Sequence, residues 1–500
     1  MLVIISDLHL TDGTSGATVS SGAFEIFAQR LSDLAVAASY RADGSYRPID
    51  RIDLVLLGDI LDVIRSTRWS KTSKAKPWNS PNDPAVASEI AQITSDILAA
   101  NEASLAVLRG LAVEGAVCVP PASSQGRPVT GAEGMGVPVR IHYMVGNHDW
   151  LFHLPGSHYD RLRQMVVRQM GLANRPDVPF PHDPAESGEL LDLMRRHKMF
   201  ARHGDIYDPF NFEGDRDASS LGDAIVIELL NRFTTAVEAE LGDELPLSAL
   251  LGLREIDNVR PLLLVPVWID GLLARSCPFP STRTQVKMIW DRLADDFLSI
   301  PFVRARDTWN PADLVDGLER ALKFSKRLSI GWASRTVSWL HGLRGKQHES
   351  YAAHALAEQD FRNRRAKHIV YGHTHHAESV PLDASFAEGY VLNQVYFNSG
   401  TWRRVHRQTQ LASGEHEFIP ADVMTYLAFF QGDERKGRPY ETWSGTLAVS
   451  PVDVPVHRVD PPQPAAARSQ SLSPPGIHTS APHFVPSPAV KGRTVPTRRV

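Results

Sequence analysis

The chain has 500 residues, a hydrophobic fraction of 43% and a charged fraction of 22%, which is typical of a globular protein with a sizeable core. The formal net charge of -4 gives no overall basic field, so composition does not indicate a nucleic-acid partner. Cys118 and Cys277 are too few and too far apart for a disulfide framework or a thiolate zinc site. No apolar run predicts a signal peptide or a transmembrane segment, so we expect a cytoplasmic protein.

Short apolar runs, continuous rather than alternating, predict strands that are buried on both faces. In chain order these runs are Leu2 to Ile5, Asp53 to Leu57, Val139 to Val145, Met199 to Arg202 and His368 to Tyr371. Helical patterns lie between them, over Ala23 to Ala38 and over Pro84 to Val113, and Pro120 to Pro138 is a predicted surface loop. The alternation of strand and helix predicts an α/β layered fold.

The composition divides the chain into four parts. Residues 1–209 and 348–450 form the two parts of the α/β domain, and strand-like composition returns at Val391 to Asn398 and Val423 to Phe430. Residues 210–347 are predicted to be a helical cap inserted between them. Residues 451–500 are rich in Pro and Ser and poor in large apolar side chains, which predicts a disordered tail.

Two features of the cap have more than one interpretation. Its most apolar stretch, Val259 to Ala274, suits either a lip for an acyl chain or a buried cap segment, and burial is favoured. Several tryptophans suit either base stacking or core packing, and packing is favoured. These tryptophans are Trp268, Trp290, Trp309, Trp332 and Trp339.

Each of the five predicted strands is followed directly by polar side chains that are typical of metal sites. They are Asp7 and His9; Asp59 and Asp62; Asn147, His148 and Asp149; His203 and Asp205; and His373 and His375. Loops at the carboxyl ends of strands converge on one crevice in layered α/β folds, so we expect these side chains to meet. Any one of these motifs alone suits a helix cap or a core histidine, but five in order favour a metal centre. Nitrogen and oxygen donors without sulfur suit Mn, Fe, Zn or Co.

These motifs resemble those of the calcineurin-like metallophosphoesterase superfamily. The matching segments are Asp7 with His9, Gly58 to Asp62, Gly146 to Asp149, His203, Gly372 to His375, and the run Tyr396 to Trp402. Within the superfamily the nearest resemblance is to UDP-diacylglucosamine pyrophosphohydrolases. Those enzymes are shorter, lack an insertion of this size and commonly carry Arg where His148 stands.

The resemblance implies a four-layer α/β/β/α sandwich with the cap inserted into it. It also implies two divalent metal ions, with Mn the first choice and Fe or Zn as alternatives. The implied ligands are Asp7, His9, Asp59 and His375 for the first ion, and Asp59, Asn147, His203 and His373 for the second, with Asp59 bridging. His148 is the implied general acid, oriented by Asp62, while Asp149 and Asp205 would orient ligands.

The resulting functional prediction is a binuclear phosphoesterase that hydrolyses a phosphomonoester, phosphodiester or pyrophosphate bond. Its substrate would be a phosphorylated small molecule or a lipid-linked molecule. The alternatives are a nuclease of the same fold and a metal-bound interaction scaffold without catalysis. The sequence leaves the substrate, the native metal and the oligomeric state open.

Overall fold

The computed structural model describes residues 1–71, 75–260, 264–307, 314–327, 350–387, 390–412 and 415–446. The described residues all lie in the first of the two units into which the chain divides, Met1–Val449. The predicted disorder of residues 451–500 lies outside the described residues, as do Trp309, Trp332 and Trp339 of the cap.

The larger sheet is built around three parallel strands. β1 (Leu2–Ile5) pairs with β2 (Ile52–Leu57), which pairs with β5 (Val139–Met144). β1 and β2 are buried along their whole lengths, as continuous apolar runs predict. Antiparallel strands extend the sheet beyond β1. They are β12 (Glu415–Phe429), β11 (Arg404–Ala412) and β13 (Tyr440–Thr446), and the short β7 (Val259–Arg260) pairs in parallel with β11.

The smaller sheet has four strands in the order β6-β8-β10-β9. Their bounds are β6 (Met199–Ala201), β8 (His368–Tyr371), β10 (Tyr390–Asn398) and β9 (Glu378–Ala387). β6, β8 and β10 run parallel to one another. The carboxyl ends of β6 and β8 therefore lie at the same edge of this sheet.

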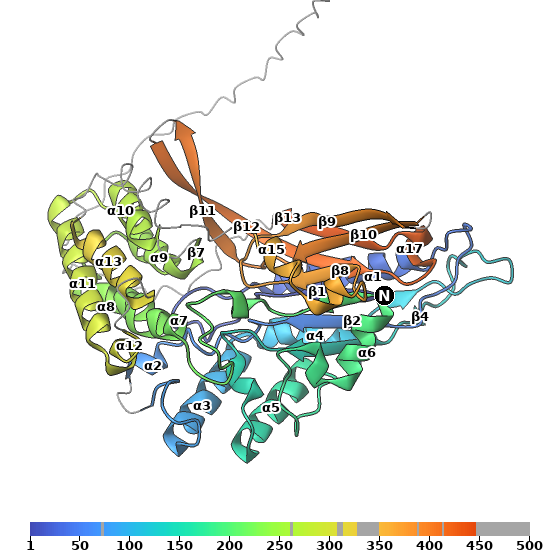
Figure 1. Cartoon of the computed structure of the whole chain (residues 1–500), viewed down its shortest axis with the longest axis horizontal. Coiled ribbons are helices and arrows are strands. Elements are labelled where there is room, and N and C mark those ends of the chain that lie inside the picture. Colours follow the sequence, from blue (N-terminus) through green and yellow to red (C-terminus); the bar gives the residue numbers. More distant parts are fainter. Residues whose placement is uncertain are drawn as a thin grey trace, which may run out of the picture. The chain divides into compact units, whose positions relative to one another are not determined.

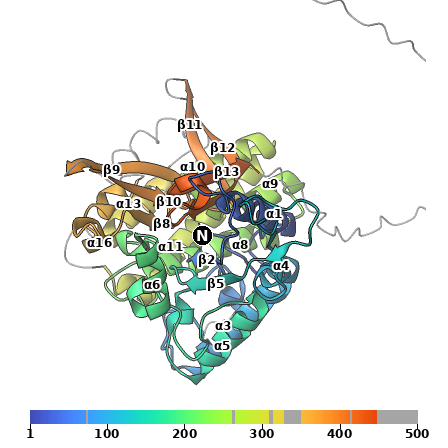
Figure 2. The ribbon, with the colours of Figure 1, turned by 90° about the vertical axis from the view of Figure 1, so that its right-hand side faces the viewer.

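The two sheets pack face to face through one apolar cluster, which joins Ile4 and Val55 of the larger sheet to Val370 and Phe397 of the smaller. Helices cover the other face of the larger sheet, and Figure 2 shows them on the side of β2 and β5 opposite β8 and β10. These helices are α1 (Ser21–Ala38), α3 (Pro84–Ala100), α4 (Glu102–Val113) and α5 (Ser157–Met170). The fold is mixed α/β, which confirms the predicted class at this level.

Short helices contribute to the remaining faces of the sheets. α6 (Gly188–Arg196) joins the cluster between the sheets, and α15 (Ala352–Ala355) packs against Ile369 of the smaller sheet, with α16 (Gln359–Arg362) nearby in the chain. Two further short helices are α2 (Arg68–Lys71) and α17 (Glu434–Gly437).

The segment from Pro84 to Val113 differs from the single helix that its periodicity predicts. It forms two helices, because the first ends at Asn101. The side-chain amide of Asn101 donates to the carbonyl oxygens of Thr11, at 2.8 Å, and Ile97, at 2.7 Å. Asparagine side chains compete in this way with the helical backbone pattern. The predicted loop from Pro120 to Pro138 also contains a strand, β4 (Met135–Gly136), which pairs with β3 (Cys118–Val119).

The regular elements in the described part of the cap are helices and the short strand β7, which joins the edge of the larger sheet (Figure 1). Its helices are α7 (Leu221–Ala224), the π-helix Ile225–Asn231, α8 (Arg232–Leu241), α9 (Leu247–Leu253), α10 (Val265–Ser276), α11 (Pro280–Ser299), α12 (Pro301–Arg304) and α13 (Leu314–Arg327). Val265, Trp268 and Leu273 of the apolar stretch are buried, as is Trp290. Across the described ranges, no helix combines the length and apolar character needed to cross a membrane.

Candidate metal centre

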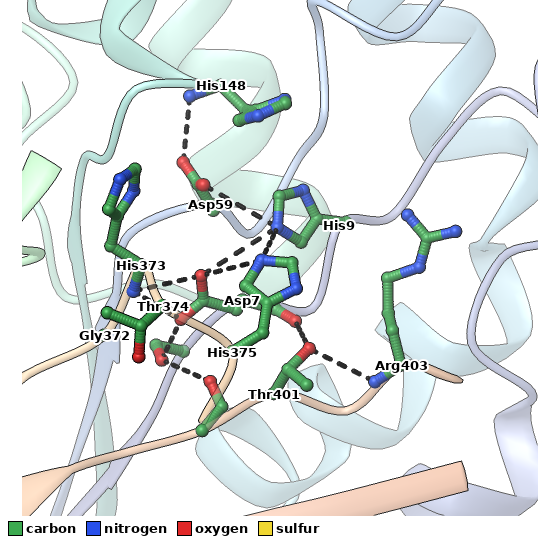
Figure 3. Close-up of polar contacts among 12 residues, drawn as sticks. Asp7, His9, Asp59, His148, Gly372, His373, Thr374, His375, Thr401 and Arg403 are labelled. Atoms are coloured by element: carbon green, nitrogen blue, oxygen red, sulfur yellow. Dashed lines mark hydrogen bonds and ion pairs between the residues drawn. The ribbon is translucent and has the colours of Figure 1, made fainter. Parts of the chain in front are cut away.

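The loops that follow β1, β2, β5, β6 and β8 bring the seven predicted ligands to one place. Their donor atoms form two sets. One contains Asp7, His9 and His375, and the other contains Asp59, His203 and His373. Within each set the donor atoms lie within 4.8 Å of one another. Figure 3 shows Asp7, His9 and His375 directed toward one another, with Asp59 above them.

The backbone at this place is unusual for residues with side chains. Five of the predicted ligands have a positive φ, at 52° for Asp7, 45° for His9, 55° for Asp59, 67° for His373 and 56° for His375. This left-handed conformation costs free energy in residues other than glycine, although Asp and His adopt it more readily than most, and residues held in it cluster at functional sites. The surrounding packing must therefore hold these residues in their positions.

The first donor group is centred on the Nε2 atom of His9. This nitrogen lies 2.9 Å from Nε2 of His375, 3.6 Å from Oδ2 of Asp59 and 3.9 Å from Oδ1 of Asp7. Asp7 Oδ1 is also 3.3 Å from His375 Nε2. All four side chains are buried.

The second donor group is centred on Asn147. Its side-chain oxygen lies 3.2 Å from Nε2 of His203 and 2.9 Å from Nδ1 of His373. Nε2 of His203 is also 3.2 Å from Oδ2 of Asp59. The same carboxylate oxygen of Asp59 thus faces both groups, as a bridging ligand would.

In His203 and His9, the hydrogen bond made by Nδ1, the ring nitrogen that points away from the centre, determines that the lone pair is on Nε2. Nδ1 of His203 lies 2.9 Å from the carbonyl oxygen of Leu57, which only accepts, so Nδ1 is the donor. In a neutral ring Nε2 then has no hydrogen and faces two acceptor oxygens, those of Asp59 and Asn147. His9 is arranged in the same way, because its Nδ1 lies 2.8 Å from Asp62 Oδ2. Convergent acceptors of this kind need a cation or a proton between them, and this donor set fits divalent metal ions.

The electrostatics of the cluster indicate the same requirement. Burial opposes ionisation of Asp59, yet His203 and His148 hold the pKa of this carboxyl well below its usual range. Burial likewise disfavours the charged ring of His203, but Asp59 overcomes that effect and raises the pKa of His203 to about 10. In the absence of a metal, protons on the histidines balance the buried carboxylates.

His375 differs from the other histidines because it contacts a guanidinium group. Nη2 of Arg260 lies 3.1 Å from Nδ1 and 3.3 Å from Nε2 of His375. Burial, followed by the charge of Arg260, lowers the pKa of His375 well below its usual value. His375 is therefore neutral at physiological pH, as a metal ligand must be.

The two predicted catalytic residues form a hydrogen-bonded pair beside the cluster. Nδ1 of His148 lies 2.7 Å from Oδ1 of Asp62, and the backbone N–H of His148 donates to Asp59 Oδ1 at 2.8 Å. Burial lowers the pKa of His148, but the charges of Asp62 and Asp59 outweigh it and raise the pKa to about 10. Asp62 therefore holds both His9 and His148 in position.

The two aspartates that were expected to orient ligands have different surroundings. Asp149 accepts hydrogen bonds from the backbone N–H groups of Ile60, at 2.8 Å, and Gly146, at 2.6 Å, and from the hydroxyl of Tyr143, at 2.6 Å. It thereby ties together the loops after β2 and β5. Asp205 instead pairs with Arg216 at 2.9 Å.

Two residues that sequence reasoning did not single out also contact the centre. Asp208 Oδ2 lies 3.1 Å from Nε2 of His373, which fixes the proton of that ring on Nε2. The lone pair is then on Nδ1, the nitrogen that faces the side-chain oxygen of Asn147. The position of Asp208, three residues after Asp205 in the same loop, was a local signal for this role. Arg260 gave no such signal, because it lies in the cap and is far from His375 in the sequence.

Glycine at position 146 allows the loops to approach closely. A Cβ atom at Gly146 would lie 2.7 Å from Cδ2 of His203, well inside van der Waals contact. The backbone of this loop therefore packs directly against a predicted ligand.

Comparison of the sequence with protein-family models and with curated proteins finds no match.

Proposed function

We propose that this protein is a phosphoesterase that acts through a pair of divalent metal ions. The observation that carries the proposal is the position of Asp59, whose Oδ2 atom faces His9 at 3.6 Å and His203 at 3.2 Å. A carboxylate between two groups of nitrogen and oxygen donors is the arrangement that a binuclear hydrolytic centre requires. Mn is the first choice of metal, with Fe or Zn as alternatives.

We also propose that the fold is the four-layer α/β/β/α sandwich of the metallophosphoesterases. The face-to-face packing of the two sheets through Ile4, Val55, Val370 and Phe397 supports this proposal. So do the helices that cover the outer face of the larger sheet and the short helix α15 against Ile369 of the smaller one.

The residues around the centre have distinct roles in this proposal. Bound metal ions would neutralise the charge of a phosphate group and lower the pKa of a water molecule. Asp62 engages Nδ1 of His148 at 2.7 Å, which leaves Nε2 of that ring to give a proton to the leaving oxygen. The guanidinium of Arg260 is always charged and suits binding of a phosphate oxygen.

The test is hydrolysis by the purified full-length protein, with Mn²⁺ added, of aryl phosphate monoesters and diesters. We expect metal-dependent activity that Asp59→Asn abolishes and that His148→Ala reduces by about 100- to 10,000-fold, the range for loss of general acid catalysis. Asp192→Asn is the matched control, because Asp192 is exposed on α6. A panel of nucleotides, nucleotide sugars, phospholipids and cyclic nucleotides then distinguishes monoester, diester and pyrophosphate substrates.

Two outcomes would replace the proposal with an alternative. Inactivity with Mn²⁺, Fe²⁺ and Zn²⁺ on every substrate would favour a metal-bound interaction scaffold. Cleavage of DNA that requires Asp59 and His148, without hydrolysis of small substrates, would identify a nuclease.

A further inference from the structure

A second cluster of potential metal ligands lies outside the centre described above. It consists of His153, His182 and Asp217, whose donor atoms lie within 4.8 Å of one another. Nε2 of His153 is 3.8 Å from Oδ1 of Asp217, and Nε2 of His182 is 3.6 Å from the same oxygen. The centroids of the two imidazole rings are 4.4 Å apart.

The hydrogen bonding of His153 leaves one nitrogen for a ligand. Its Nδ1 lies 2.8 Å from the carbonyl oxygen of Phe180 and must donate to it. The lone pair of the neutral ring is therefore on Nε2, the nitrogen that faces Asp217. This is the way in which ligating histidines are commonly oriented in metal sites.

His182 provides an independent observation. Only 2% of this residue is exposed, yet neither of its ring nitrogens has a hydrogen-bond partner among the described residues. Buried polar side chains are nearly always satisfied, and an exception calls for an ion or another unseen group. The backbone at this residue is anchored, because Glu186 accepts a hydrogen bond from the His182 N–H at 2.8 Å.

We propose that His153, His182 and Asp217 form a binding site for a single zinc ion. Two imidazole nitrogens and a carboxylate oxygen are a common set of three protein ligands for zinc, and water completes the tetrahedron. Donors at about 2.1 Å from one zinc ion lie about 3.4 Å apart, so the observed separations of 3.6 and 3.8 Å need only a small contraction. The side chain of Asp217 is 43% exposed, which gives the ion and its water access from solvent.

The site would connect three segments of the chain. His153 ends the short helix after Asn147 and His148, Trp150–His153, and His182 lies just before the short helix Pro184–Glu186. Asp217 lies in the loop that leads from His203 into the cap, next to Arg216, which pairs with Asp205 at 2.9 Å. A bound zinc ion would thus fix the start of the cap to the loop after β5.

The test is the zinc content of the full-length protein after chelation and dialysis into buffer with excess Zn²⁺. We expect Asp217→Asn and His182→Gln to bind one zinc ion per chain fewer than the wild type. Asp177→Asn and His158→Gln, which change exposed residues of the same region, should retain the wild-type number. An equal zinc content in Asp217→Asn and the wild type would overturn the proposal.

A second measurement keeps the test decisive if the buried His182 proves necessary for folding. Asp217 is partly exposed, so Asp217→Asn is expected to fold, and its melting temperature is compared with and without Zn²⁺. Zinc should raise the melting temperature of Asp177→Asn more than that of Asp217→Asn, because ligand binding stabilises the folded state. An equal rise in both variants would contradict the site. Neither result depends on phosphoesterase activity, so failure here is distinguishable from failure of the proposed function.

Discussion

Oδ2 of Asp62 lies 2.8 Å from Nδ1 of His9. The other carboxylate oxygen of Asp62 engages His148 at 2.7 Å, and the backbone N–H of Arg65 donates to it at 3.2 Å. One buried carboxylate thus orients both a predicted ligand and the predicted general acid.

Asp62→Asn should therefore weaken metal binding as well as catalysis. An amide presents one acceptor oxygen instead of two, so one of the two histidines loses its partner. Loss of a group that orients a ligand typically costs about 10- to 100-fold in metal affinity or activity. Titration with Mn²⁺ measures the affinity, and Asp192→Asn provides the exposed control. Unchanged affinity would show that Asp62 does not orient His9.

Gly146→Ala should disrupt the centre through sterics alone. The added methyl group would lie 2.7 Å from Cδ2 of His203, in a buried position with no room to move. Overpacking of this kind typically costs about 1 to 3 kcal/mol, and we expect loss of bound metal together with reduced stability in urea. Gly136→Ala is the matched control, because a Cβ atom there has no neighbour within 4 Å. Full metal content in Gly146→Ala would show that this loop does not pack directly against His203.

A buried ion pair connects the cap to the loop after β2. Nε of Arg65 lies 2.8 Å from Oδ2 of Asp257, and the two side chains are only 1% and 7% exposed. Asp257→Ala leaves the Arg65 guanidinium buried without this partner, which typically costs about 3 to 5 kcal/mol. Urea denaturation measures the loss.

The double variant Arg65→Met with Asp257→Leu should recover much of that stability, because it removes both charges and retains apolar volume. A double variant that is no more stable than Asp257→Ala would show that the cost lies in packing rather than in the unpaired charge.

Arg260 provides a prediction that depends on the proposed function. Its guanidinium lies against His375, so Arg260→Met should raise KM for a phosphorylated substrate by about tenfold or more, the effect of losing one charge-assisted hydrogen bond. Metal content should remain at the wild-type level. Arg254→Met is the control, because Arg254 is also in the cap but pairs with Glu238 at 2.8 Å at the surface. A change in kcat alone would argue against phosphate binding by Arg260.

His368 should make the protein less stable in acid. Burial lowers its pKa from 6.5 to about 4, so between these values the unfolded chain binds a proton that the folded chain does not. Stability therefore falls as the pH falls from 6.5 toward 4, by about 3 kcal/mol for this residue. His368→Phe should reduce the pH dependence of the free energy of unfolding, measured by urea denaturation, because phenylalanine does not titrate. Its ring suits the site, where the imidazole packs against Phe397 and Phe429. His158→Gln, at an exposed position, should keep the wild-type dependence of the free energy of unfolding on pH. The same dependence in His368→Phe as in the wild type would contradict the prediction.

Several strands of this protein and the grouping of its predicted ligands could be predicted from local sequence patterns. The buried strands at Leu2 to Ile5 and His368 to Tyr371 were predicted within their observed bounds, because continuous apolar runs bury both faces of a strand. The seven predicted ligands could be grouped because each follows such a strand, and parallel strands present their carboxyl ends at one edge.

The tertiary structure decided the features that depend on residues far apart in the chain. The break at Asn101 depends on a hydrogen bond to Thr11, and the contact between Arg260 and His375 depends on the path of the cap. The cluster of His153, His182 and Asp217 likewise has no local pattern. Periodicity and turn preferences act over a few residues, whereas these contacts form only when packing brings distant segments together.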